Sequence, residues 1–200
     1  MRYTSQQSGF SLVETLVAIT ILLIVIVGPM TISSSAAKST SFASEQVTAF
    51  FLAQEGAELM EKARNDLLLQ NFSGTNPDPW ADFTRTAAGG TYRFCYTSVG
   101  VNGCNLSIGN GSSGALTSPA SCSGQDSCKV NLDAENSSLR SKFTAGNTGV
   151  ATIYIRNIRL QQVSANEVSV TSTVTWRSGF SRDDQQVVVQ TSLFNIYENN

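Results

Sequence analysis

The N-terminal part of the chain contains a long apolar run that is interrupted by one acidic residue. After Phe10 the stretch "QQSGFSLVETLVAITILLIVIVG" (residues 6–28) is almost wholly apolar, and Glu14 is the only charge between Phe10 and Ala37. A helix over that span is about 42 Å long, against a bilayer core of about 30 Å. The strong bilayer formers within residues 16–27 favour insertion by about 3–6 kcal/mol, and a central acid costs about 2.5–3.5 kcal/mol. We therefore expect a transmembrane helix.

A helical pattern continues beyond the membrane segment, over residues 46–70. Apolar residues recur there at steps of three and four, while most of the charges take other faces. We expect one helix over about residues 10–70, apolar all round at first (10–30) and amphipathic later, with a break or loosening possible at Gly28-Pro29. The acidic patch "EGAELMEKARND" is expected to be a solvated face rather than a metal or catalytic site. The residues expected on the packed face are Val47, Phe50, Ala53, Ala57, Met60, Ala63 and Leu67.

The last fifty residues alternate between apolar and polar positions, which is typical of strands. Three strands are predicted, over residues 151–163, 167–176 and 185–197. Their short links predict an antiparallel meander, one face of which covers the amphipathic half of the helix. This is an α+β fold with the helix on one face of the sheet.

Between the helix and the meander the pattern is less regular. "NPDP" (76–79) ends the helix, and Trp80 and Phe83 are expected to anchor the connection to the core. Residues 91–99, "TYRFCYTSV", predict a strand with its three aromatic side chains on one side. Residues 100–149 are rich in Gly, Ser and Asn and predict a long surface insert. Asp78 and Asp82 leave calcium binding open, although the spacing of an EF-hand is absent.

Composition and charge exclude several classes of function. The net charge is −2 and 41% of the residues are hydrophobic, so there is no basic face for a nucleic acid. The chain has no histidine, which removes Ser-His-Asp and Cys-His nucleophile pairs and histidine-ligated zinc. We expect neither an enzyme nor a cofactor.

Four cysteines lie between residues 95 and 128. They are Cys95, Cys104, Cys122 and Cys128. An even number in a loop-rich, exported region favours two disulfides, with three possible connectivities. Loop length favours the sequential pairs 95–104 and 122–128. A zinc site is the weaker alternative, because no pair has the two-residue spacing of a zinc knuckle.

Glu14 needs a partner if it lies in the membrane. No Lys or Arg lies within a helical turn of it. Cleavage after Gly9 would create a positive amine at Phe10, four residues from Glu14, available to its own chain or to a neighbour. A small residue before the cut and an apolar helix directly after it suit a protease acting at the membrane surface.

The stretch "SGFSLVETLVAI" resembles the N-terminus of type IV prepilins and pseudopilins. The resemblance implies that residues 1–9 are a leader, that prepilin peptidase cuts between Gly9 and Phe10, and that Phe10 becomes N-methylated. It also implies that Glu14 pairs with the terminal amine of an adjacent subunit. The implied partners are other pilin subunits, the peptidase, an inner-membrane assembly platform and membrane lipid.

Alternatives to this interpretation are a secretory signal peptide cut near "SSAA" (34–37) and a simple signal anchor. The signal anchor accounts for neither Gly9 nor Glu14. The function expected is a structural subunit, with residues 71–200 as an extracytoplasmic domain and the amino end cytoplasmic before assembly. The system stays open, because a minor pilin, a major pilin, a pseudopilin of a type II secretion system and a DNA-uptake pilin all share the motif. The length of the chain and its long loop favour a minor subunit over a major one. The alternative is a membrane-anchored adhesin or binding protein that never polymerises.

Overall fold

The computed structural model describes residues 9, 11–99, 102–109, 114–124, 127–133, 142–145, 149–179 and 183–196. The chain divides into two compact units, Met1–Ser44 and Glu45–Asn200. A single helix, α1 (Leu12–Phe72), supplies the described helix of the first unit and the first element of the second.

In the first unit α1 exposes every side chain from Leu12 to Thr40. The helix runs through Gly28 and Pro29 without a break, although Pro29 has no backbone N–H to donate to the preceding turn. Hydroxyls along the segment donate back to carbonyls of the preceding turn, as Thr15 does to Leu12 and Thr20 does to Val17, each at 2.8 Å. Hydroxyl groups that make their hydrogen bonds within their own helix are suited to a segment surrounded by lipid, where no water is available as a partner.

In the second unit α1 buries a narrow face of mostly small residues. This face consists of Ala49, Leu52, Ala53, Gly56, Ala57, Leu59, Met60 and Ala63. The predicted face was partly wrong, because Val47 and Phe50 are 56% and 49% exposed. Small side chains let the helix backbone approach the sheet closely. The large side chain of Phe50 lies outside this contact, where it is exposed.

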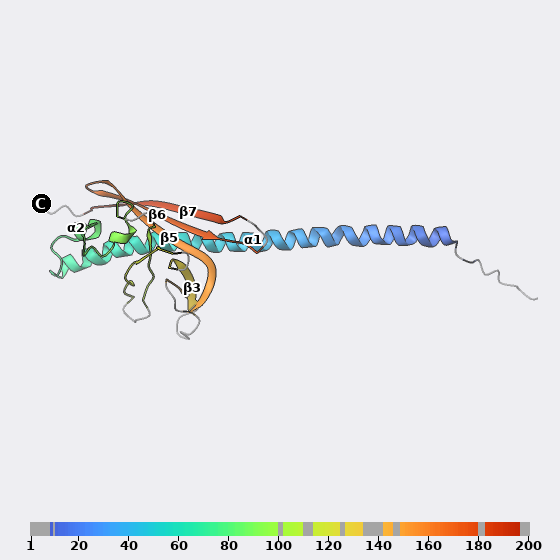
Figure 1. Ribbon diagram of the computed structural model, residues 1–200, viewed down its shortest axis with the longest axis horizontal. Coiled ribbons are helices and arrows are strands. Elements are labelled where there is room, and N and C mark those ends of the chain that lie inside the picture. The colour runs from blue at the N-terminus through green and yellow to red at the C-terminus, as the bar shows by residue number, and fades with distance from the viewer. Residues whose placement is uncertain are drawn as a thin grey trace, which may run out of the picture. The chain divides into compact units, whose positions relative to one another are not determined.

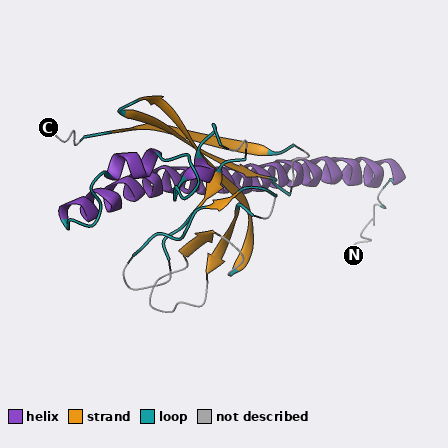
Figure 2. Ribbon diagram, turned by 60° about the vertical axis from the view of Figure 1, so that its left-hand side comes forward, coloured by secondary structure: helices purple, strands orange, loops and turns teal. Residues whose placement is uncertain are grey.

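Within the described residues the sheet has seven strands, all paired antiparallel. The central strand β5 (Val150–Ser164) pairs with β6 (Glu167–Trp176), which pairs with β7 (Gln185–Phe194). On its other side β5 pairs with β1 (Cys104–Asn105) and β3 (Lys129–Asp133), which pair in turn with β2 (Ala120–Ser121) and β4 (Lys142–Ala145). Figures 1 and 2 show β5, β6 and β7 crossing the part of α1 that belongs to this unit.

The meander and its alternation are confirmed. Val168, Val170, Val174 and Trp176 are all buried on the face of β6 that is turned to the helix. Leu193 is buried on β7, while Val188 and Phe194 are exposed on the opposite face. The helix therefore packs on one face of an antiparallel sheet, and the other face carries mainly hydroxyl and amide side chains.

Residues 91–99 do not form the predicted strand. Arg93–Cys95 is a short 3₁₀ helix, η1, and only Tyr96 makes a bridge, to Leu160. Tyr92, Cys95 and Tyr96 are buried at steps of three and one, and Phe94 is 44% exposed. The alternating aromatic residues therefore do not share one face.

The connection before η1 folds as a short helix, α2 (Pro79–Thr84), that the sequence did not indicate. The carboxylate of Asp78 accepts from the backbone N–H of Ala81 at 3.0 Å and caps this helix. Trp80 and Phe83 are buried, as predicted. The indole N–H of Trp80 donates to the carbonyl of Ala165 at 2.7 Å, which ties α2 to the β5–β6 turn.

Residues 100–149 are more than a surface insert. Their described parts supply β1, β2, β3 and β4, and residues 103–107 are buried. β1 and β2 have two residues each, which is too short to produce an alternating pattern, so the sequence did not reveal these two strands.

Candidate functional site: the N-terminal segment and a buried arginine network

The predicted processing site lies at the exposed start of the described chain. A side chain added at Gly9 would meet no atom within 4 Å. Phe10, the predicted first residue after the cut, lies outside the described residues. Gly9 itself is therefore exposed, and the role of either residue stays a prediction.

Glu14 lies in the first turn of α1 with an exposed side chain. A carboxylate there is favoured by the partial positive charge of the helix N-terminus. Around it the apolar side chains of residues 12–27 are also exposed, each by about half or more. One helix in this part of the chain is long and apolar enough to cross a membrane, judged by length and composition.

The four cysteines form two disulfides. Cys95 is bonded to Cys104 and Cys122 to Cys128, with Cα atoms 4.7 Å and 5.2 Å apart. These are the pairs that loop length favoured. Cys95 and Cys104 are fully buried in the main hydrophobic core, so the first disulfide joins η1 to β1 inside the domain.

A buried arginine next to this disulfide was missed by the sequence reasoning. The side chain of Arg156 on β5 has no exposed surface, and its Nη1 lies 2.9 Å from Oε2 of Glu55 on α1. It also donates to the carbonyl of Leu52 (3.4 Å), to Oδ1 of Asn105 (2.9 Å) and to the carbonyl of Leu106 (2.6 Å). Burial lowers the pKa of Arg156, and the charge of Glu55 raises it.

The network changes the interpretation of the acidic patch on α1. Glu58 and Glu61 are exposed as a solvated face requires, but Glu55 turns toward the sheet and pairs with Arg156. The signal was present in the sequence. In "YIRNIRL" the position of Arg156 has the same parity as the core residues Ile158 and Leu160.

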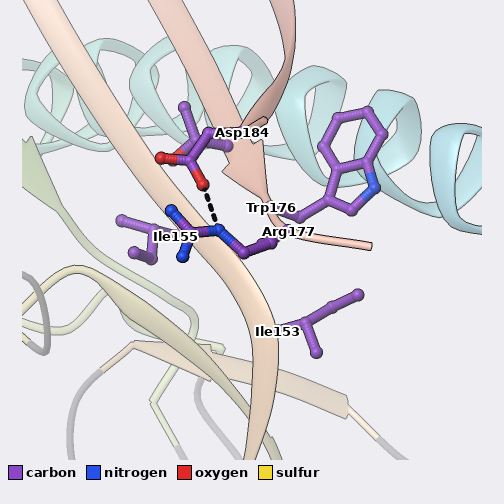
Figure 3. A pocket seen from close by; sticks show the side chains of 6 residues that line it. Ile153, Ile155, Trp176, Arg177 and Asp184 are labelled. Atoms are coloured by element: carbon purple, nitrogen blue, oxygen red, sulfur yellow. Dashed lines mark hydrogen bonds and ion pairs between the residues drawn. The ribbon is translucent and has the colours of Figure 1, made fainter. Parts of the chain in front are cut away.

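A shallow hollow of about 260 Å³ lies where β5 and β6 approach the start of β7. Ile153 and Ile155 line it, and Arg177 pairs with Asp184 at 2.8 Å across it (Figure 3). Both charged side chains are about two-thirds exposed, so water screens the pair. Within the described ranges, no group of three or more histidine, cysteine or acidic residues is placed to hold a metal. The carboxylate of Asp78 caps α2, and that of Asp82 lies 3.6 Å from the guanidinium of Arg85.

A comparison with protein families matches the prokaryotic N-terminal methylation motif to residues 4–28. No curated protein and no solved structure matches the chain. The matched residues include Gly9, Phe10 and Glu14 and end within the exposed apolar part of α1. The motif supports a precursor of the type IV pilin kind, and the apolar helix that follows is consistent with membrane anchoring.

Proposed function

We propose that the chain is a structural subunit of a type IV pilus or of a type II secretion pseudopilus, most simply a minor pilin. The observation that carries this proposal is the methylation motif leading directly into an apolar helix whose only charge, up to Ala37, is Glu14. In this proposal the protein has no catalytic role. Its activity is assembly.

The chemistry of assembly follows from the cost of burying charge. Removal of residues 1–9 would leave a positive amine on Phe10, at the end of an apolar helix. When such helices bundle, an unpaired amine or carboxylate costs several kcal/mol. Pairing the amine of one subunit with Glu14 of the next removes that cost only in the correct register.

Processing is tested on the native product. Mass spectrometry of the mature N-terminus should find an N-methylated Phe10, and Gly9→Leu should leave an unshifted precursor band on a gel. A product that begins at Met1 would favour the non-polymerising anchored binding protein, and one that begins just after Ala37 a secretory signal peptide. Either result would overturn the proposal.

Assembly is tested by Glu14→Ala. We expect this variant to insert into the membrane normally and to be lost from sheared filaments. Glu58→Ala is the matched control, because Glu58 is an exposed glutamate in the second unit that accepts a hydrogen bond from Gln54 on its own helix. Normal incorporation of the Glu14 variant would refute the pairing role. The abundance of the wild-type chain in sheared filaments distinguishes a minor from a major subunit.

A further inference from the structure

The guanidinium of Arg156 contacts two segments that are distant in the sequence. On α1 it donates to the carboxylate of Glu55 and to the carbonyl of Leu52. On β1 and the residue after it, the guanidinium donates to the side chain of Asn105 and to the carbonyl of Leu106. Two contacts thus lie on the helix and two lie one and two residues after Cys104. The same cation joins the helix to the segment that carries a disulfide.

Gly56 shows how closely the helix approaches at this point. A Cβ added at Gly56 would lie 3.0 Å from Cδ of Arg156 and 2.3 Å from Oγ of Ser172. There is no room for a water shell between α1 and the arginine. A buried guanidinium without its acceptors is costly, so docking of the helix and placement of the β1 segment each stabilise the other through Arg156.

We propose that Arg156 is a redox-sensitive latch, which couples closure of the Cys95–Cys104 disulfide to docking of α1 on the sheet. With the disulfide closed, Cys104 is fixed to η1. This holds the side chain of Asn105 and the carbonyl of Leu106 in position to accept hydrogen bonds from Arg156. With both cysteines reduced, that segment is held by fewer bonds, the arginine loses acceptors, and α1 docks less firmly. Coupling of this kind is reciprocal, so Arg156 also favours disulfide closure.

The covalent step needs an oxidant of the disulfide class. The thiols of Cys95 and Cys104 react with one external disulfide, forming one S–S bond in the protein and breaking one in the reagent. Two electrons and two protons pass to the reagent, which leaves as two thiols. Oxidised glutathione serves as the reagent in the test below.

The second disulfide provides an internal reference. Cys128 is tied to β5 mainly through the backbone, since its carbonyl accepts from the backbone N–H of Arg156 at 2.9 Å and, over a longer distance of 3.4 Å, from the side chain of Asn105. The backbone bond persists when the arginine side chain is removed. A general loss of stability would change the redox equilibrium of both disulfides. Loss of the contacts of the Arg156 side chain would change mainly the redox equilibrium of Cys95–Cys104.

The test equilibrates the full-length protein, in detergent micelles, across mixtures of reduced and oxidised glutathione, and measures each disulfide by differential alkylation and mass spectrometry. In Arg156→Met we expect Cys95–Cys104 to need about a tenfold more oxidising mixture, within the usual range of coupling between sites. Cys122–Cys128 should shift much less. Arg159→Met is the matched control on the exposed face of the same strand, and neither disulfide should shift in it.

A milder pair of variants decides the matter if Arg156→Met does not fold. Glu55→Gln keeps an acceptor but removes the charge that neutralises the arginine, and should shift Cys95–Cys104 in the same direction by a smaller factor. Glu58→Gln, one helical turn away and exposed, should shift nothing. Equal shifts of both disulfides in the Arg156 or Glu55 variants, or no shift in either variant, would overturn the proposal.

The reciprocal measurement follows α1 itself. In the double variant Cys95→Ser, Cys104→Ser we expect backbone amides around Leu52–Met60 to exchange hydrogen about tenfold faster than in the oxidised wild type. In an Arg156→Met background the same cysteine changes should accelerate exchange far less. Equal acceleration in both backgrounds would mean that the two features stabilise the domain independently, and the latch would be rejected.

Discussion

At the scale of single residues, buried polar groups have a larger effect on this fold than surface charge pairs. The Lys62–Asp66 and Arg177–Asp184 pairs are partly or largely exposed, and pairs of that kind contribute about 0–1 kcal/mol. Arg156 and Tyr96, by contrast, are fully buried and each donates to a backbone carbonyl. Removing a buried partner leaves an unsatisfied group, which costs about 1–3 kcal/mol.

Tyr96 makes stability depend on alkaline pH. Its hydroxyl donates to the carbonyl of Phe83 at 3.1 Å, and burial raises its pKa well above the ordinary value. Above about pH 10 the unfolded tyrosine ionises while the folded one stays neutral, so its contribution is complete below that pH and is lost as the pH rises. The slope is about 1.4 kcal/mol per pH unit for each such tyrosine.

The variant Tyr96→Phe tests this at two values of pH. At pH 8 we expect it to lower the free energy of unfolding by about 1–3 kcal/mol, since the carbonyl of Phe83 loses its donor. Between pH 10 and 11 it should lose less stability than the wild type, which denaturant titrations measure directly. Tyr92 and Tyr154, whose pKa values are also raised by burial, account for the slope that remains. An unchanged slope would contradict the assignment to Tyr96.

At the scale of elements, the contact between α1 and the sheet depends on the absence of a side chain at Gly56. Gly56→Ala places a Cβ 2.3 Å from Oγ of Ser172. Overpacking of this kind costs about 1–3 kcal/mol, which opposes the gain of about 1 kcal/mol from better helix propensity. We expect a net loss of up to about 2 kcal/mol in the unfolding of the second unit.

Two further variants make the Gly56 prediction specific. Ser172→Ala removes the nearest atom, so the double variant should recover part of the loss. Gly28→Ala, where an added Cβ meets nothing within 4 Å, should leave unfolding of the second unit unchanged. If Gly56→Ala stabilises the domain, the helix has more freedom against the sheet than the geometry indicates.

The elements that the sequence predicted well are those with long, regular patterns. Alternation over ten or more residues revealed β5, β6 and β7, and helical periodicity revealed α1. The packed face of α1 was harder to predict. Ala49 and Gly56 lie on it because their small size allows close approach to the sheet, and such residues add little to a hydrophobic pattern. The two-residue strands β1 and β2 depend on tertiary pairing and on the disulfides, so local pattern could not reveal them.

The candidate site divides in the same way. Local sequence identified Gly9, Phe10 and Glu14 as a motif, but their roles depend on a peptidase and a second subunit and stay predictions. Arg156 depends on contacts across 101 residues to Glu55, which no short window contains. The sequence indicated only that Arg156 lies on the same face of β5 as its core residues. The acceptors that make its burial favourable are brought together by the fold.

At the scale of the whole molecule, the two units differ in where they find partners for their apolar surface. In the second unit, apolar residues pack against one another, and every described buried residue lies at position 49 or later. In the first unit the apolar side chains of residues 12–32 have no protein around them in the single chain. They need lipid or other copies, which is what the proposed passage from membrane to filament would supply.

This difference predicts the behaviour of a chain that begins at residue 45. Because the described core draws nothing from residues 9–44, we expect residues 45–200 to fold without detergent and to unfold within a few degrees of the full-length protein in micelles. The truncated chain should also lose all partition into lipid vesicles, which sedimentation measures.

Cys95→Ser, Cys104→Ser in the same background should lower its melting temperature, because the first disulfide lies wholly within this unit. Aggregation of the oxidised truncated chain, or a melting temperature far below that of the full chain, would show that residues before 45 also stabilise the folded unit.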